Sequence, residues 1–357
     1  MQEILVNTAA KSYPLKIKNG LFNEDNAYSV LKGRKAVIVT DSNIAPLYGE
    51  GLLAKLRNLG IDSDIYVIPA GESSKSHDEL LKLYNYLSSL NITRSDFIIA
   101  LGGGVTGDLA GFAASTYLRG LNLIQIPTSL LAMVDSSIGG KVAVNLPAGK
   151  NLVGSFYQPE EVLIDPLLLN TLPDRHFADG MAEVIKYGCI RDKGLFLILE
   201  SLKDREEVMG NIEEIIFRCC SVKKDVVEQD EREKSLRMIL NFGHTFGHAI
   251  EKCFDYKTYT HGEAVAIGMV FISDLSVKTG FCQRDSAERI KKLLLKFNLP
   301  VDFPKLKAGD VFNAVIKDKK ARTGHINLVL IEDIGSVRIE KFSKDRIGGL
   351  IDEMLGN

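Results

Sequence analysis

Cysteine is scarce in this chain, and its few positions form no recognisable pattern. The 357 residues include five cysteines, an odd number, and no two of them form a CxxC pair. Secreted domains stapled by disulfides carry an even set, and thiolate zinc sites use closely spaced pairs. We therefore expect a reducing, cytoplasmic setting and no cysteine-ligated metal.

Excess charge and long apolar runs are missing as well. Lys and Arg total 44 and Asp and Glu total 46, so the net charge of −2 gives no global attraction to nucleic acid or anionic membranes. The longest apolar run, 264–272, is too short to cross a bilayer, and the first residues lack the segments of a secretory signal. We expect no nucleic-acid partner and no membrane insertion.

The first half of the chain alternates strand-like with helix-like patterns, which favours an α/β domain with a doubly wound, Rossmann-like parallel sheet. The expected strands are 35–40, 64–68, 97–101 and 123–126, and the expected helices between them are 44–59 and 77–90. Longer amphipathic patterns then predict helices over 177–199, 211–228, 236–253, 263–278 and 287–297, and a late hairpin pairs 326–331 with 336–339. The length exceeds one small core, so we expect an α/β domain over 1–165 and a mainly α-helical domain over 166–357.

A glycine-rich loop follows the expected strand 97–101. Gly102, Gly104 and Gly107 satisfy G-x-G-x-x-G within GGGVTGD, and an apolar helical pattern comes next. Glycines let the backbone approach a pyrophosphate, whose charge is favoured by the free N–H groups at a helix start. A tight turn without a ligand is the alternative, since such loops recur in α/β folds. The loop follows the third expected strand rather than the first, which is not the standard Rossmann placement.

Two earlier strand ends carry carboxylates that suit a nucleotide ribose. Asp41 follows KAVIVT, and Glu72 lies in PAGESSKS after DIYVI. A carboxylate that accepts from the ribose diol repels a 2′-phosphate, so these positions favour NAD over NADP. Asp41 is equally suited to cap the next helix.

Polar residues recur at helical spacing in LRMILNFGHTFGHAIE. Arg237, Asn241, His244 and His248 are spaced by 4, 3 and 4 positions, which predicts one polar stripe on an otherwise apolar helix. Buried polar groups without partners cost about 1 to 3 kcal/mol each, so the stripe indicates a ligand site or a satisfied structural network.

A third histidine extends this pattern towards a metal site. His261 begins the next helical pattern, and HxxxH with a downstream histidine is typical of zinc binding. A carboxylate ligand would come from the segment FADGMAEVIKYG, in which Asp179, Glu183 and Lys186 share a helical face. Spacing alone does not choose among these ligands.

Ten segments together resemble the 3-dehydroquinate synthase family of the sugar phosphate cyclase superfamily. They are DSN at 41–43, GESSKS at 71–76, GGGVTGDLAGFAAS at 102–115, RG at 119–120, IPTSLLAMVDSSIGGK at 126–141, PAGKN at 147–151, GMAEVIKYG at 180–188, NFGHTFGHA at 241–249, HGEA at 261–264 and DKK at 318–320. The resemblance covers nearly the whole chain. Its departures are small: Ser129 and Ser235 replace residues common in the family, and neither replacement alters an expected metal ligand.

The resemblance implies a cofactor pair. The family's zinc ligands fall on Glu183, His244 and His261, with Co²⁺ as a possible substitute for Zn²⁺. The family binds NAD in the N-terminal domain, here 1–165. The resemblance places the following residues around NAD: Asp41, Asn43, Glu72, Lys75, Gly103, Gly104, Val105, Asp108, Thr128, Ser129, Asp135, Lys141 and Lys150.

The resemblance also implies a sugar phosphate substrate, 3-deoxy-D-arabino-heptulosonate 7-phosphate, and a homodimer. Matching substrate positions are Asp135, Lys141, Lys150, Asn151, Lys186, Lys223, Arg237, Asn241 and His248, with Lys319 or Lys320 and with Arg119 from a neighbouring subunit. The implied reaction oxidises the C5 hydroxyl, eliminates phosphate, restores the alcohol and closes a carbocycle to 3-dehydroquinate. A metal-dependent polyol dehydrogenase of the same two-domain plan is one alternative, and a non-catalytic zinc and nucleotide binding protein is another.

Overall fold

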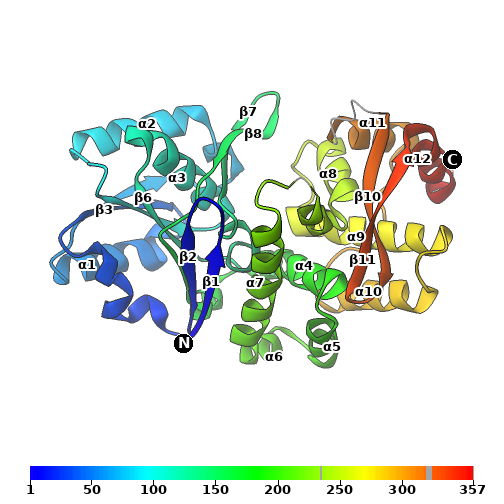
Figure 1. Cartoon of the computed structure of the whole chain (residues 1–357), viewed down its shortest axis with the longest axis horizontal. Helices are drawn as coiled ribbons and strands as arrows, with labels where there is room; N and C mark the ends of the chain where they lie inside the picture. The colour runs from blue at the N-terminus through cyan, green and yellow to red at the C-terminus, as the bar shows by residue number, and fades with distance from the viewer. Residues whose placement is uncertain (234, 319–323, 357) are drawn as a thin grey trace. The chain divides into compact units, whose positions relative to one another are not determined.

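The computed structural model describes residues 1–233, 235–318 and 324–356 (Figure 1), so Lys319 and Lys320 lie outside the described residues. The chain divides into two compact units. One comprises Met1–Pro173 with Lys223–Glu228, and the other comprises Asp174–Val222 with Gln229–Asn357. No helix among the described residues is both long enough and apolar enough to cross a membrane.

A seven-stranded sheet organises the first unit. Its order is β1-β2-β9-β6-β5-β3-β4; β1 and β2 are antiparallel and the other neighbours are parallel. The strands are β1 Gln2–Asn7, β2 Ser12–Ile17, β3 Lys35–Asp41, β4 Asp62–Ile68, β5 Phe97–Gly102, β6 Asn122–Pro127 and β9 Glu161–Ile164. The four strands expected from the sequence are confirmed, whereas β1, β2 and β9 were not predicted.

Helices cover both faces of this sheet (Figure 1), which explains why β5 is buried at all six of its positions. On one face, leucines of α2 (His77–Ser89) and apolar residues of α3 (Gly104–Thr116) pack on Val37, Val39 and Ile98. On the other face lies α1 (Glu50–Asn58), which buries Leu52 and Leu56. A separate hairpin, β7 (Lys141–Leu146) and β8 (Gly149–Phe156), follows η6 (Ala132–Ser136).

The order of the strands creates a switch point beside the glycine loop. The chain runs from β3 outward to β4 and then returns across β3 to β5. In open α/β sheets, ligands bind outside the carboxyl ends of the two strands at which the chain reverses direction. Asp41 ends β3, Gly102 ends β5, and Thr106 Oγ1 donates to Asp41 Oδ2 over 3.4 Å. The glycine loop therefore lies at the edge where ligands bind in sheets of this kind, even though it does not follow the first strand.

The second unit is mainly helical, with one antiparallel hairpin. Its helices are α4 Asp174–Ile190, α5 Lys193–Ser201, α6 Arg205–Gly210, α7 Ile212–Gln229, α8 His244–Cys253, α9 His261–Lys278, α10 Arg284–Lys296, α11 Ala308–Asp318 and α12 Lys344–Leu355. The hairpin, β10 (His325–Asp333) with β11 (Ser336–Ser343), confirms the predicted pairing. Within α7, residues Lys223–Glu228 belong to the first unit.

Three predicted helices are interrupted. The segment 236–253 is not one helix: η8 (Leu236–Asn241) is a 3-10 turn, and α8 begins only at His244. Gly243 between them has φ +79°, a left-handed conformation that no α-helix continues through. The segment 177–199 breaks after Ile190, where Asp192 caps α5, and 44–59 begins with a π-turn before α1. The expected continuous polar stripe is therefore wrong.

Glycines allow α8 and α9 to pack closely. A Cβ at Gly268 would lie 2.0 Å from the carbonyl oxygen of Gly243 and 2.8 Å from the amide nitrogen of Gly247. We expect Gly268→Ala to lower the free energy of unfolding by about 3 kcal/mol, because backbone atoms cannot move aside as a side chain can. Gly349→Ala in exposed α12, where a Cβ meets nothing within 4 Å, is the matched control and should be neutral or slightly stabilising. Denaturant midpoints of both variants check this, and equal midpoints would contradict the close packing.

Candidate metal and substrate site

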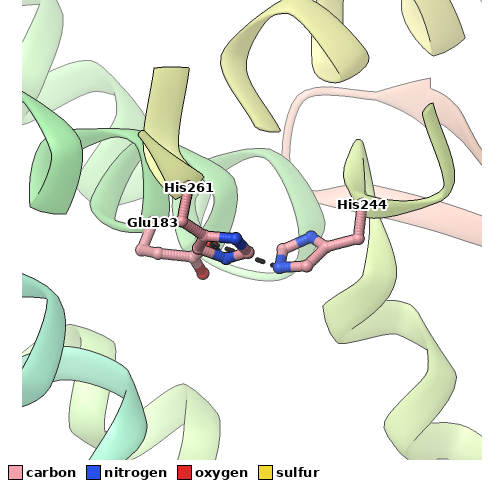
Figure 2. A group of neighbouring side chains, drawn as sticks. All are labelled: Glu183, His244 and His261. Carbon is pink, nitrogen blue, oxygen red and sulfur yellow. Dashed lines mark ion pairs between the residues drawn. The ribbon is translucent and has the colours of Figure 1, made fainter. Parts of the chain in front are cut away.

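Three side chains from separate helices converge in the second unit (Figure 2). Glu183 lies on α4, and His244 and His261 are the first residues of α8 and α9. Glu183 Oε1 lies 3.3 Å from His244 Nε2 and 3.7 Å from His261 Nε2. Donor atoms about 2.1 Å from a tetrahedral metal are roughly 3.4 Å apart. The donor set therefore fits one divalent cation with three protein ligands and a position left for substrate.

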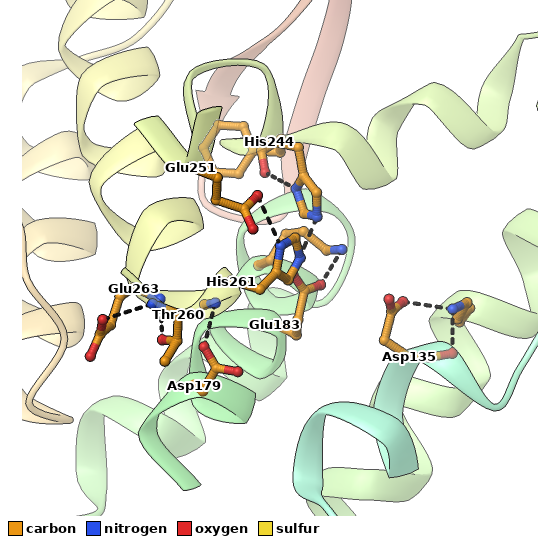
Figure 3. Close-up of polar contacts among 12 residues, drawn as sticks. Asp135, Asp179, Glu183, His244, Glu251, Thr260, His261 and Glu263 are labelled. Atoms are coloured by element: carbon orange, nitrogen blue, oxygen red, sulfur yellow. Dashed lines mark hydrogen bonds and ion pairs between the residues drawn. The ribbon is translucent and has the colours of Figure 1, made fainter. Parts of the chain in front are cut away.

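Local structure explains how both histidines reach this point. Gly243 turns the chain at the N-terminus of α8, and a capping box holds the N-terminus of α9: Thr260 accepts from the backbone of Glu263, and Glu263 accepts from the backbone of Thr260 over 2.9 Å. The amide of Gly262 donates to Asp179 on α4 (Figure 3). A Cβ at Gly262 would lie 2.1 Å from the Asp179 carbonyl oxygen, so only glycine allows this approach of α9 to α4.

Glu183 is fully buried and forms an ion pair with Lys186 one turn later on α4. A buried carboxylate is tolerated when a cation compensates its charge. Asp179, the other carboxylate that spacing left open, bonds to the α9 backbone instead, so the structure separates the two candidates.

Burial and neighbouring charges shift the two imidazoles in opposite directions. Burial lowers the pKa of His244 to about 4, although Glu183 opposes that shift. Burial also disfavours a charged His261, but Glu251 and Glu183 outweigh this effect and raise the pKa of His261 to about 9. Near neutral pH without a metal, His244 is therefore neutral, whereas both ring nitrogens of His261 are protonated and the ring is positively charged.

This difference predicts proton release on metal binding. A metal ion must displace the His261 proton at pH values below about 9, whereas His244 has none to lose. We expect binding at pH 7 to release about one proton, and the affinity to rise about tenfold per pH unit between pH 6 and 8. Calorimetry in buffers of different ionisation enthalpy measures the released proton. An affinity that does not change with pH would contradict this prediction.

The remaining polar residues of the predicted stripe lie on either side of Gly243. Arg237 is buried in η8, and its Nη1 donates to the Glu231 carbonyl over 2.5 Å. Asn241 Nδ2 donates to Glu233 Oε1 over 2.7 Å. His248 lies one turn after His244 on α8, with ring centroids 5.5 Å apart. The structure thus places His248 beside His244 and His261, whereas Arg237 and Asn241 belong to the preceding turn.

A second polar cluster lies in the first unit. Lys75 Nζ contacts Asp108 Oδ2 and Asn151 Oδ1. The backbone amide of Asn151 donates to Asn145 Oδ1 over 2.9 Å. Asn145 Nδ2 in turn donates to Glu72 Oε1 over 2.7 Å. Burial raises the pKa of the Asp108 carboxyl, although Lys75 opposes the shift. Four predicted positions, Glu72, Lys75, Asp108 and Asn151, are therefore held in one network.

Asp135 and Lys223 form another predicted pair. Lys223 Nζ lies 2.6 Å from Asp135 Oδ1 and also contacts the Asp135 carbonyl (Figure 3). The lysine lies in the part of α7 that belongs to the first unit. The two residues are 88 positions apart, so no spacing rule connects them.

The other predicted positions in the first unit are placed individually. Asp41 Oδ1 accepts from the amides of Asn43 and Ile44 in the turn after β3. The alternative that Asp41 caps the next helix is wrong, because the N-caps of the π-turn and of α1 are Ile44 and Gly49, without a side-chain capping bond. Gly103 caps α3, and Gly104 begins it. The rest are placed as follows: Val105 in α3, Thr128 and Ser129 after β6, Lys141 at the start of β7, Lys150 in β8 and Arg119 exposed with φ +67°.

Comparison with known proteins decides the family. Models of the "3-dehydroquinate synthase N-terminal" and "3-dehydroquinate synthase C-terminal" domains match residues 65–179 and 180–321. A 3-dehydroquinate synthase from Clostridium beijerinckii is 51% identical over 96% of this chain and 98% of its own length. The chain belongs to the 3-dehydroquinate synthase family. It is accordingly an enzyme of this activity, a phosphate-eliminating cyclase, as the sequence resemblance predicted.

Further relatives and solved structures agree with this family. A 3-dehydroquinate synthase from Enterococcus faecalis is 41% identical over 98% of both chains. A 2-deoxy-scyllo-inosose synthase complexed with carbaglucose-6-phosphate, NAD⁺ and Co²⁺ has a TM-score of 0.88, 27% identity, and covers 99% of this chain and 100% of its own. The 2-epi-5-epi-valiolone synthase from Streptomyces hygroscopicus subsp. jinggangensis, with NAD⁺ and Zn²⁺ bound, has a TM-score of 0.88 and 28% identity over 97% of both chains. The two-part α/β and helical fold is thereby confirmed.

The polyol dehydrogenase alternative is not better supported. An iron-containing alcohol dehydrogenase is 14% identical with a TM-score of 0.64, over 96% of this chain and 97% of its own. That likeness concerns the fold alone.

Proposed function

We propose that this member of the 3-dehydroquinate synthase family converts 3-deoxy-D-arabino-heptulosonate 7-phosphate to 3-dehydroquinate and phosphate with NAD⁺ and Zn²⁺, the second step of the shikimate pathway. The supporting observation is that this chain, which matches the family models, brings the carboxylate of Glu183 and the imidazoles of His244 and His261 as close together as ligands of one metal ion. When bound, the two cofactors supply what side chains lack, namely a reversible hydride acceptor for C5 and a Lewis acid for its oxygen.

The proposed metal ligands are Glu183, His244 and His261. A His₂Glu set leaves a coordination position open, as a catalytic rather than a structural site requires. Zn²⁺ is the proposed ion, and Co²⁺ would accept the same ligands.

The proposed NAD site is the carboxyl edge of the first unit's sheet. The switch point between β3 and β5 and the glycines at the N-terminus of α3 support it, because a pyrophosphate is favoured there. The residues proposed to bind NAD are Asp41, Asn43, Glu72, Lys75, Gly103, Gly104, Val105, Asp108, Thr128, Ser129, Asp135, Lys141 and Lys150.

The proposed substrate residues divide by the group that they would bind. Arg237 and Asn241 suit the carboxylate, since a guanidinium forms paired hydrogen bonds with it. Lys141, Asn151 and His248 suit the phosphate, together with Arg119 from a second subunit of a homodimer. Lys150, which precedes Asn151, is proposed to contact the substrate as well. Asp135, Lys186 and Lys223 are proposed for the hydroxyl groups. His248, beside His244, is proposed to move the proton of the reacting alcohol.

A turnover assay tests this function. The full chain, NAD⁺ and the heptulosonate phosphate should release one phosphate per 3-dehydroquinate formed, with no net accumulation of reduced nicotinamide. Accumulation of reduced nicotinamide without phosphate release would instead support a dehydrogenase. Size measurement in solution tests the homodimer, and fractionation of cells tests the cytoplasmic setting.

A further inference from the structure

A carboxylate outside the predicted site faces one of its histidines. Glu251 lies on α8, seven residues after His244 and therefore on nearly the same helical face. Glu251 is only 5% exposed, and its Oε2 lies 3.5 Å from His261 Nδ1 (Figure 3). Helix α8 thus contributes one candidate ligand directly and contacts a second through Glu251.

The two ring nitrogens of His261 face two different carboxylates. Nδ1 faces Glu251, and Nε2 lies 3.7 Å from Glu183 Oε1. An ionised carboxylate only accepts hydrogen bonds, so a neutral ring with its proton on Nδ1 satisfies Glu251 and directs the Nε2 lone pair towards the site. His244 follows the same pattern, because its Nδ1 lies 3.1 Å from the Phe242 carbonyl oxygen, which also only accepts.

Close packing of α8 on α9 keeps Glu251 and His261 together. A Cβ at Gly247 would lie 3.1 Å from the Ala264 carbonyl oxygen and from backbone atoms of Val265, next to the first turn of α9. The carboxylate and the imidazole therefore come from two backbone segments in direct contact, which limits how far the ring can turn.

We propose that Glu251 is a positioning residue that selects the His261 tautomer and orients its Nε2 for the metal. A partner of this kind on the second ring nitrogen fixes the orientation of a ligand histidine and raises its basicity. This inference rests on the metal site of the proposed function.

Metal affinity of the full chain tests the proposal without any turnover measurement. Zn²⁺ dissociation constants are determined against a competing chelator for the parent, Glu251→Gln and Glu251→Ala at a pH above about 9, so that no proton competes for His261 in any of the three proteins. We expect roughly tenfold weaker binding in Glu251→Gln, which keeps an acceptor oxygen but loses the charge, and up to about a hundredfold in Glu251→Ala. Co²⁺-loaded protein should show altered ligand-field absorption in both variants. Lys252→Gln, an exposed neighbour on α8, should bind like the parent.

Three results would overturn the positioning role. Zn²⁺ affinity within twofold of the parent in Glu251→Gln is the first. A lower melting temperature of the metal-free variant with unchanged metal affinity is the second, since it indicates structure alone. The third is a content of two zinc ions per parent chain but only one in Glu251→Gln, which would make Glu251 itself a metal ligand. Such a second site is worth testing because the donor atoms of His248, Glu251 and His261 also lie within 4.8 Å of one another. Failure of the underlying site is seen separately: Glu183→Gln would keep parental Zn²⁺ affinity.

Discussion

His261→Ala is expected to abolish stable metal binding and to lower turnover by roughly a thousandfold or more, about 4 kcal/mol of transition-state stabilisation. The reason is geometric: His261 supplies one of three donor atoms, and the Nε2 of His244 and the Oε1 of Glu183 alone do not complete a catalytic set. NAD⁺ binding should remain near the parental level, because the proposed nucleotide residues lie in the first unit. Elemental analysis, kinetics and nucleotide titration of one preparation measure all three effects.

His176→Ala is the matched control for this variant. His176 is exposed on α4, the helix that carries Glu183, and its imidazole is not among the candidate metal donors. The control should keep parental zinc content and turnover. Undiminished zinc in purified His261→Ala would show that the ligand assignment is wrong.

Arg237→Ala is expected to lower kcat/KM by roughly 30- to 1000-fold, about 2 to 4 kcal/mol, mainly through KM. The guanidinium is buried in η8, where its Nη1 donates to the Glu231 carbonyl. A substrate carboxylate would pair with the planar fork of the guanidinium. Arg237→Lys keeps the charge without this geometry and should recover only part of the loss.

A purely structural Arg237 predicts a different outcome. Its removal would lower the melting temperature while the folded protein kept parental kinetic constants. Zinc content should stay parental in Arg237→Ala, since the arginine is not one of the three proposed ligands. Exposed Arg232→Ala controls for the loss of a positive charge nearby.

The parallel sheet could be predicted because its strands are short runs of β-branched and aliphatic residues bounded by turns. The strands β3, β5 and β6 are of this kind, and their burial on both faces requires that composition. The edge hairpin of β1 and β2 alternates buried with exposed residues and includes Pro14, so its pattern is weaker. Strand β9 has only four residues, too few for a period to show.

The candidate site was only partly predictable from spacing. The spacing of 4, 3 and 4 positions from Arg237 to His248 predicted one helix. Gly243 interrupts it in a left-handed conformation, which the periodicity of the polar residues does not reveal. The pairing of Asp135 with Lys223 depends on a contact across 88 residues, which follows from the fold and not from local sequence. Glu251 could have been found as the i+7 partner of His244 on α8, because seven residues are close to two helical turns. The spacing of the histidines led only to the carboxylates of Asp179 and Glu183, and Glu251 was not predicted.

The most direct measurement of the central claim is metal-dependent phosphate release from the heptulosonate phosphate. Full-length protein is stripped with a chelator, assayed with NAD⁺, and reassayed after one equivalent of Zn²⁺ is added. We predict that stripping abolishes both phosphate and 3-dehydroquinate production and that one zinc per chain restores them in the parent but not in Glu183→Gln. Undiminished phosphate release from the stripped protein, or full recovery in Glu183→Gln, would contradict a catalytic metal held by Glu183, His244 and His261.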